Sequence, residues 1–347
     1  MKFKPEKIKK ILCIKPRGIG DIILSTIILD NLIAYFPSAK IDYLTEEFAK
    51  HAVENNPLVN KVLTMKKTDL SIKTAFKIRK EKYDLILDMW SNPWTAQITF
   101  FSGVKYRAGF AYRGRKYAYN IHATSERGEH HSAEHNLELL RALNIPIISK
   151  HVYYFVSEKE DMLGKNFIEK NVPHGYSIMG IIPSGGWPSK RCDKEKWVEI
   201  IKTVSEKYRT KFIILWGPGD ETDADFITSR LPEQTIIAPK TDIPAMAGII
   251  KNCSLIIAND SGPMHLAAAM GIPTIGLFGP TNPQMHRPYS ENSAYVINKD
   301  LFCIVCNFTE CPYKHECFTK LPVETVLDKI DYLIGKSRIK IIKNEKA

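Results

Sequence analysis

The chain has 347 residues, more than one hydrophobic core usually holds, which predicts two domains of roughly 150 to 200 residues. Hydrophobic residues make up 44% of it and charged residues 25%, proportions that exclude a disordered or fibrous protein. Forty-nine Lys and Arg against 38 Asp and Glu give a net charge of +11. This surplus favours an anionic partner such as a nucleotide, a phosphorylated substrate, a nucleic acid or an acidic membrane surface.

Two features of the chain bear on its compartment. The basic N-terminal segment is followed by an apolar run that Lys15, Pro16 and Arg17 interrupt, so the apolar core of a secretory signal is missing. No uncharged apolar run approaches the roughly 20 residues that a membrane-spanning helix needs. We therefore expect a cytoplasmic protein.

Short apolar runs alternate with helical patterns along most of the chain, which predicts parallel sheets covered by helices on both faces. The predicted strands are 11–14, 40–44, 61–65, 83–89 and 106–110 in the first half, and 176–183, 212–216, 235–238, 255–258 and 274–278 in the second. The predicted helices are 22–33, 134–143, 194–207, 243–252, 262–270 and 323–334. Because two such series join near residues 157–175, we expect an α/β protein of two doubly wound domains that face one another. The expected divisions are domains 1–165 and 166–322, then a C-terminal helix and basic tail, 323–347.

Four loops follow predicted strands, at the edge where open parallel sheets bind ligands. The first loop, residues 17–21, contains Gly18 and Gly20, which allow the backbone to turn tightly and approach a ligand. Asp21 stands at the start of the following helix. Its carboxylate either caps that helix, which stabilises it by about 1 kcal/mol, or lies at the mouth of an interdomain cleft, where it accepts a proton.

The second and third loops combine small residues with charges. In residues 183–191, Lys190 follows a run of small residues and a tryptophan, a composition typical of a phosphate-binding loop and also of a solvated turn. The small residues of interest there are Gly185, Gly186 and Ser189. Residues 215–221 end in Asp220 and Glu221, and this acidic pair either binds sugar hydroxyls or caps the next helix.

The fourth loop, residues 259–265, is the most informative. Ser261 and Gly262 begin a helix of small residues, so this helix can pack closely and direct its positive end at a diphosphate. His265 is either a packed, satisfied histidine or a hydrogen-bond donor to an anionic ligand. The segment also contains Asp260 and Met264, and the next predicted strand leads into Gly-Pro-Thr, which ends at Thr281.

These segments, in this order, resemble glycosyltransferase family 9, the ADP-heptose:lipopolysaccharide heptosyltransferases and their relatives. The resemblance covers most of the chain. It is strongest in the Asp-Ser-Gly-x-x-His block and in the Gly-Pro-Thr that follows the next predicted strand. The segments that carry it are 20–21, 36–43, 56–57, 83–84, 185–191, 217–219, 260–265 and 278–281.

The resemblance implies a GT-B fold, with two Rossmann-like domains facing a central cleft, the acceptor on the N-terminal half and the nucleotide sugar on the C-terminal half. It implies an inverting, metal-independent transfer of a sugar onto a lipopolysaccharide core or related glycolipid, with heptose from ADP-heptose as the leading donor. Another nucleotide sugar, used for transfer, hydrolysis or epimerisation, is the alternative. Lys15, Gly185, Gly186 and Cys192 depart from residues common in the family. They leave the donor's base and sugar open.

The resemblance also implies roles for individual residues. Asp21 would be the general base for the acceptor hydroxyl, and Lys190 would neutralise the leaving diphosphate. The residues expected to bind the nucleotide sugar are Gly185, Gly186, Ser189, Asp220, Glu221, Asp260, Ser261, Gly262, Met264, His265 and Thr281. The residues expected to bind the acceptor are Gly18, Gly20, Arg107, Arg113 and Arg115. No metal cofactor is required for such a transfer.

A basic and aromatic segment, residues 105–119, contains five cations and five aromatic residues without an acid. Such a segment can bind an anionic glycolipid, can bind single-stranded nucleic acid, or can be a solvated basic face. We favour acceptor binding by one or two of its cations. A non-catalytic nucleic-acid-binding protein is the rival hypothesis, but it gives the four strand-end loops no common purpose, so we expect no nucleic-acid partner. The basic chain ends predict weak attraction to an anionic membrane surface.

Four cysteines fall within fifteen residues, with the spacing C-x2-C-x4-C-x5-C. They are Cys303, Cys306, Cys311 and Cys317. The first pair has the spacing of a zinc half-site, whereas the second is looser than in a zinc ribbon. We interpret the cluster as structural, with reduced thiols ahead of bound zinc and disulfides last, since cytosolic disulfides are rare.

Overall fold

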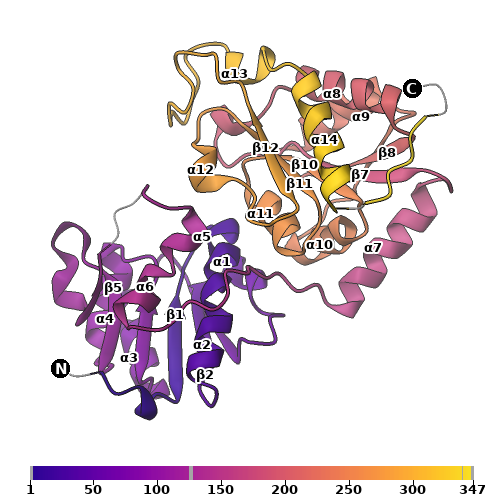
Figure 1. Ribbon diagram of the computed structural model, residues 1–347. Helices are drawn as coiled ribbons and strands as arrows, with labels where there is room; N and C mark the ends of the chain where they lie inside the picture. Colours follow the sequence, from indigo (N-terminus) through magenta and orange to yellow (C-terminus); the bar gives the residue numbers. More distant parts are fainter. Residues whose placement is uncertain (1–2, 125–127, 338, 345–347) are drawn as a thin grey trace. The chain divides into compact units, whose positions relative to one another are not determined.

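The computed structural model describes residues 3–124, 128–337 and 339–344, which form two compact units, Met1–Phe155 and Val156–Ala347 (Figure 1). The units divide ten residues before the expected boundary at 165/166. They do so because helix α7 (Glu158–Asn171) packs on helix α10 (Ile243–Lys251) of the second unit. The C-terminal helix α14 (Glu324–Ser337) buries its apolar side in the core of that same unit.

The first unit is built on a six-stranded parallel sheet with the order β3-β2-β1-β4-β5-β6. Its strands are β1 (Lys10–Ile14), β2 (Lys40–Glu46), β3 (Lys61–Met65), β4 (Leu85–Asp88), β5 (Tyr106–Phe110) and β6 (Ile121–Ala123). The central strands are buried on both faces, which is why they appear in the sequence as continuous apolar runs. From β1 the chain continues to β2 and β3 on one side of the sheet, and from β4 it continues to β5 and β6 on the other. Strands β1 and β4 therefore flank the switch point where such sheets bind ligands.

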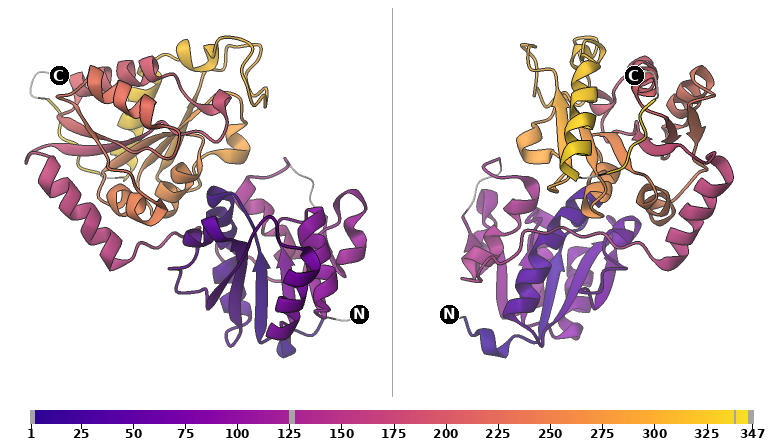
Figure 2. Two further views of the ribbon diagram at one scale, coloured as in Figure 1. Left: turned by 180° about the vertical axis from the view of Figure 1, so that it is seen from behind. Right: turned by 45° about the vertical axis from the view of Figure 1, so that its right-hand side comes forward.

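Helices cover both faces of this sheet (Figure 2). They are α1 (Ile19–Ser25), α2 (Leu29–Tyr35), α3 (Ser71–Glu81), α4 (Pro93–Ser102), α5 (Ser132–His135) and α6 (Glu138–Ala142), with 3₁₀ helices η1 (Pro5–Lys7), η2 (Thr26–Ile28), η3 (Glu47–Ala52) and η4 (Tyr112–Ala118). Right-handed crossovers put the helices that follow β1 and the helices that follow β3 and β4 on opposite faces. Accordingly α1 contacts η3, whereas α4 contacts α3 and η4. Helix α5, which follows β6, returns to the face of α1 and contacts it.

Two helices that the sequence predicts as continuous are interrupted. In the predicted helix 22–33, the Ser25 and Thr26 hydroxyls donate to the carbonyls of Ile22 and Ile23, each at 2.7 Å, and η2 separates α1 from α2. In the predicted helix 134–143, the Asn136 amide donates to backbone carbonyls upstream, and the segment divides into α5 and α6. Polar side chains that bond to the local backbone compete with regular helix in this way.

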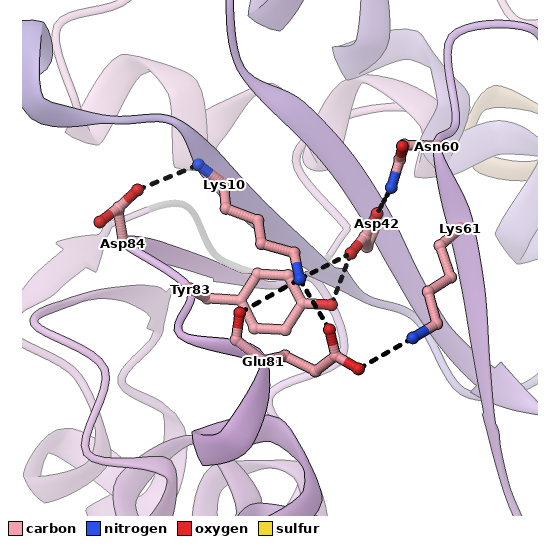
Figure 3. A network of polar contacts seen from close by, with 7 residues as sticks. All are labelled: Lys10, Asp42, Asn60, Lys61, Glu81, Tyr83 and Asp84. Atoms are coloured by element: carbon pink, nitrogen blue, oxygen red, sulfur yellow. Dashed lines mark hydrogen bonds and ion pairs between the residues drawn. The ribbon is translucent and has the colours of Figure 1, made fainter.

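A network of hydrogen bonds and ion pairs connects the strands of the first unit near their amino ends (Figure 3). The carboxylate of Asp42 is fully buried, and it accepts hydrogen bonds from the Tyr83 hydroxyl and the Asn60 amide, both at 2.7 Å. The Lys10 ammonium lies 3.7 Å from Asp42 and 2.7 Å from Glu81. Hydrogen bonds from Lys10 and Lys61 lower the pKa of Glu81 to about 2. The network joins β1, β2, β3 and the end of α3, at the edge opposite the strand-end loops.

The second unit repeats the same strand order, β12-β11-β10-β7-β8-β9, again entirely parallel. Its strands are β7 (Ser177–Ile182), β8 (Thr210–Ile214), β9 (Thr235–Ile237), β10 (Leu255–Asn259), β11 (Thr274–Phe278) and β12 (Ser293–Ile297). Its remaining helices are η5 (Pro188–Lys190), α8 (Lys194–Lys207), α9 (Glu221–Arg230), α11 (Gly262–Ala269), α12 (Pro283–His286) and α13 (Glu316–Thr319). Here β7 and β10 flank the switch point. The described part of the chain holds no helix with the length and apolar character needed to cross a membrane.

Candidate functional site

In the loop that follows β1, Gly18 lies against the carboxylate of Asp21. Gly18 has a φ of 78° and precedes the first residue of α1, and Asp21 lies half-buried in the first turn of that helix. A Cβ atom on residue 18 would lie 2.2 Å from Oδ2 of Asp21. Glycine is therefore required here both for the backbone conformation and for the approach of the carboxylate.

Two cations of the same segment, Arg17 and Lys15, bond to the ends of the neighbouring strands β2 and β4. Arg17 donates two hydrogen bonds, of 2.7 and 2.9 Å, to the buried carboxylate of Glu46 at the end of β2, and this contact raises the pKa of Arg17. On the other side, the ammonium of the buried Lys15 lies 3.3 Å from the Met89 carbonyl and 5.2 Å from the Trp90 ring. A cation and an aromatic ring thus flank the switch point. Sequence reasoning did not assign Trp90 to the site.

Asp88 shapes the turn that follows β4. Its fully buried carboxylate accepts from the Ser91 backbone N–H at 2.8 Å and from the Tyr119 hydroxyl at 2.8 Å. Burial raises the pKa of Asp88, although the bonds from Ser91 and Tyr119 oppose that shift. Because the groups that donate to Asp88 belong to the protein itself, this carboxylate stabilises the turn after β4 and does not face a ligand.

The three arginines expected to bind the acceptor have different environments. Arg107, on β5, donates to the carbonyls of Ala118 at 2.9 Å and Val104 at 2.7 Å, and burial lowers its pKa. Arg113 is exposed in η4 with a φ of 45°, and Arg115 is half-buried two residues later. Arg107 therefore fixes η4 to the sheet, and Arg113 is the most accessible of the three.

In the second unit, three strand-end loops converge on one carboxylate. Oδ2 of Asp260, after β10, lies 2.8 Å from the Lys190 ammonium and accepts a hydrogen bond of 2.7 Å from the Thr281 hydroxyl. Lys190 also lies 4.5 Å from the centre of the Trp187 ring. Burial opposes ionisation of Asp260, but Lys190, His265 and the hydrogen bond from Thr281 together outweigh it, and the net effect is a lowered pKa. Residues predicted from separate motifs thus meet in space.

Arg191 joins two further loops of the predicted donor region. Its guanidinium donates to the carbonyls of Gly185 and Gly219, each at 3.3 Å, and lies 3.0 Å from Oδ1 of Asp220. Asp220 is buried, whereas Glu221, the first residue of α9, is exposed. Arg191 was given no role from the sequence, although its position next to Lys190 was the available signal.

The start of helix α11 contains a side-chain hydroxyl that does not cap the helix. Ser261 is its N-cap but makes no capping hydrogen bond, and its buried Oγ has no hydrogen-bond partner among the described residues. The first N–H groups of a helix lack intrahelical acceptors and favour an anion. In α11 Gly262 and Met264 carry such groups, because Pro263 between them has no N–H. Met264 and His265 are buried in the first turns of the helix. A phosphate oxygen fits this combination of a hydroxyl and free N–H groups.

The cysteine loop packs directly behind the loop of Lys190. The backbone N–H of Ser189 donates to Thr309 at 3.2 Å, and its hydroxyl donates to Phe308 at 2.5 Å, so this predicted donor residue also tethers the loop. The side chains that line one small pocket there, with a volume of about 10 Å³, include Cys303, Cys306, Cys311 and Cys317. All four thiols are free, and burial raises the pKa of Cys317 to about 12. Within the described residues, no three His, Cys, Asp or Glu side chains are arranged to hold a metal ion.

Comparison with known proteins places this arrangement among sugar transferases. The model of glycosyltransferase family 9 (heptosyltransferase) matches residues 72–316, more than half of the chain. The lipooligosaccharide heptosyltransferase 2 of Haemophilus influenzae is 24% identical over 348 residues, which cover 94% of this chain and 99% of that protein.

Solved structures agree on the fold. A family 9 glycosyl transferase from Veillonella parvula superposes with a TM-score of 0.83 at 20% identity, covering 94% of this chain and 97% of that one. The ADP-heptose lipopolysaccharide heptosyltransferase II of Escherichia coli gives a TM-score of 0.77 at 22% identity, with coverage of 95% and 99%. Together with the two Rossmann-type sheets, these likenesses confirm the predicted GT-B fold class.

Proposed function

The chain belongs to glycosyltransferase family 9 and is a glycosyltransferase, and from this premise we propose that it transfers heptose from ADP-heptose onto a lipopolysaccharide core or related glycolipid. The observation that carries the proposal is the convergence of Lys190, Asp260 and Thr281 beside the start of α11. Relatives named for heptose transfer to lipopolysaccharide or lipooligosaccharide support the choice of sugar and acceptor.

The proposed reaction inverts the anomeric centre in one displacement. The acceptor hydroxyl attacks the anomeric carbon, a new C–O bond forms, and the bond from that carbon to the diphosphate oxygen breaks. Asp21 takes the proton of the attacking hydroxyl as general base. The close packing of Gly18 against Asp21 supports this role, because it fixes the carboxylate at the end of β1.

Lys190 and the N-terminus of α11 stabilise the leaving diphosphate. As the bond to the anomeric carbon breaks, negative charge collects on ADP, and preorganised cations and N–H groups lower the energy of that transition state. The Lys190 ammonium is paired with Asp260, so a diphosphate that binds here becomes a second anionic partner of this ammonium. These groups perform the work for which other transferases use a divalent metal, and we propose that no metal takes part.

The other predicted residues complete the two binding sites. Asp220 or Glu221 holds the ribose hydroxyls, and the donor site further comprises Gly185, Gly186, Ser189, Ser261, Gly262, Met264, His265 and Thr281. The acceptor site comprises Gly18, Gly20, Arg107, Arg113 and Arg115. Because such acceptors are anchored in lipid, we place the reaction at the inner face of the cytoplasmic membrane, with weak attraction to its surface. We propose reduced thiols in the cysteine cluster, which metal analysis of the purified protein tests.

A donor panel tests the proposal. The purified protein is incubated with a heptose-deficient lipopolysaccharide core and, in separate reactions, ADP-heptose, ADP-glucose and UDP-glucose, and products are analysed by mass spectrometry. We expect a mass gain of one heptose with ADP-heptose and inversion at the new linkage by NMR. Transfer only from another nucleotide sugar would overturn the donor assignment, and release of free sugar without acceptor modification would overturn transfer itself.

A further inference from the structure

Exposed apolar side chains of the first unit gather on one part of it. Eight large hydrophobic residues are exposed among the described residues of this unit, and six of them lie on α3, on α4, on η4 or directly before α3. These six are Leu70, Ile72, Phe76, Phe100, Phe101 and Tyr117. Scattered single hydrophobic residues are normal on a protein surface, but a cluster of this kind marks a contact surface.

The aromatic members of the cluster form a continuous series across three elements. Arg79 on α3 lies 5.6 Å from the Phe76 ring and donates to the Phe101 carbonyl on α4 at 3.1 Å. The ring centres of Phe100 and Phe101 are 5.3 Å apart, and those of Phe100 and Tyr117, on η4, are 5.4 Å apart. Phe76, Phe100 and Tyr117 are 51%, 43% and 52% exposed, so the series presents its rings to solvent.

Cations surround these rings. Lys73, Lys77 and Lys80 recur at intervals of four and three along α3, so they share one exposed stripe of the helix with Phe76. The inward side of the helix buries Thr74, Ala75 and Ile78 instead. We call the surface formed by the six apolar residues and the lysines 73, 77, 80, 105 and 116 the aromatic–basic face.

The segment that contains the aromatic–basic face, residues 66–119, carries most of the chain's charge excess. Residues 66–119 contain twelve Lys and Arg against four Asp and Glu, so they supply eight of the eleven net positive charges. The four acids are engaged within the unit. Asp69 accepts from the Lys66 N–H, Glu81 pairs with two lysines, Asp84 accepts from the N–H groups of Lys9 and Lys10, and Asp88 is buried. The positive charge of this surface is therefore poorly compensated.

The chemistry of the face favours a lipid surface over a nucleic acid. Nucleic-acid stacking uses open ring faces, but Phe100 meets Phe101 and Tyr117 edge to face, at interplanar angles of 75° and 73°. Leu70 and Ile72 offer no ring at all. Aromatic and aliphatic side chains that enter the acyl boundary, surrounded by lysines at headgroup level, are typical of helices that lie on anionic membranes.

We propose that the aromatic–basic face docks the protein on the surface of an anionic bilayer. The lysines bind lipid phosphates, and the rings of Phe76, Phe100 and Phe101 insert between headgroups. The proposal rests on the proposed function only in this respect: a lipid-anchored acceptor gives such docking its purpose. Docking by this face leaves α1 and α5 free, because they lie on the opposite side of the sheet.

Vesicle flotation tests the proposal directly. The full chain is mixed with vesicles of phosphatidylcholine and phosphatidylglycerol at 3:1, or of phosphatidylcholine alone, in 0.1 M salt. We expect flotation with the anionic vesicles and at least tenfold less with the neutral ones. The variants F76S/F100S/F101S and K73A/K77A/K80A each lower binding at least tenfold, whereas the matched control F48S/I148S, which alters the two exposed hydrophobic residues outside the face, binds like the parent chain.

Equal binding by all variants, or none by the parent chain, would overturn the proposal. So would binding to a 20-nucleotide RNA that displaces the vesicles, because the face would then serve a nucleic acid. Circular dichroism melting of each variant is expected to match the parent, since all the changed residues are exposed. Transfer to a delipidated, soluble acceptor is expected to persist in every variant. Absence of that transfer from the parent chain too would count against the proposed function, while the flotation result would stand by itself.

Discussion

The ammonium of Lys190 and the carboxylate of Asp260 lie 2.8 Å apart, although 69 residues separate them in the chain and they follow different strands. The pair keeps the cation ready at the start of α11 and keeps Asp260 ionised while it is largely buried. A diphosphate that binds here meets a charge that is already positioned, which is the condition for electrostatic stabilisation of a leaving group.

Replacement of this cation should therefore impair the chemical step. For Lys190→Ala we expect a loss of about 100- to 1,000-fold in kcat with ADP-heptose, the usual effect of removing one preorganised charge. Steady-state kinetics measure it, and Lys194→Ala, which removes a lysine that instead lies 4.6 Å from the Phe226 ring, is the matched control. Unchanged kcat in Lys190→Ala would show that another group stabilises the leaving diphosphate.

The second prediction concerns the loop of the proposed base. In Gly18→Ala the new Cβ collides with Asp21, and the left-handed backbone is strained by about 1–2 kcal/mol. Displacement of a catalytic group by about 1 Å can reduce transfer roughly 100-fold. Gly271→Ala separates the two effects, since Gly271 has a φ of 77° but no heavy atom of the described residues within 4 Å of a new Cβ. Equal activity of the two variants would refute the role of the Gly18–Asp21 contact.

Two glycines allow α7 and α10 to cross at close range. A Cβ on Gly248 would lie 2.0 Å from the Glu160 carbonyl, and one on Gly164 would lie 2.0 Å from the Gly248 carbonyl. Overpacking of this kind lowers the free energy of unfolding by about 1–3 kcal/mol, which urea denaturation of Gly248→Ala measures. Gly335→Ala in α14 has open space among the described residues, so it should stabilise the protein by about 0.5–1 kcal/mol. A neutral Gly248→Ala would argue against the close crossing.

Acid should weaken the network at the amino edge of the first sheet. The pKa of Glu81 is lowered from 4.5 to about 2 by Lys10 and Lys61, so its contribution to stability is complete above pH 4.5 and is lost as the pH falls toward 2. We expect Glu81→Gln to be less stable than the parent at pH 7, with a difference that shrinks steadily below pH 4.5. Urea midpoints at several pH values measure it. A difference that persists at pH 2 would exclude this cause.

The central strands and the edge strands β3 and β9 could be predicted from the sequence, whereas the edge strands β6 and β12 could not. Strands β4 and β10 are fully buried, so their apolar runs are continuous. Strands β6 and β12 each bury a single residue and leave no such run. Helix α7 also escaped prediction, because it buries only Gly164 and because its contact with α10 depends on the absence of a side chain at that glycine.

The site shows the same division between local pattern and tertiary contact. The strand-end loops could be predicted, because glycines, hydroxyls and charges directly after apolar runs mark them in the sequence. The pairing of Lys190 with Asp260 could not, since it depends on the adjacency of β7 and β10 in the sheet. Arg191 escaped for a similar reason, because its bonds to Gly185 and Gly219 link loops of two different strands.

The most direct test of the central claim is single-turnover transfer by Asp21→Asn. The substitution keeps the size of the side chain and removes its ability to accept a proton, so we expect transfer from ADP-heptose to fall at least 100-fold. Binding of ADP, measured by calorimetry, should remain that of the parent chain. Transfer by Asp21→Asn at the parent rate would contradict the account, because the acceptor hydroxyl would then lose its proton to some other group.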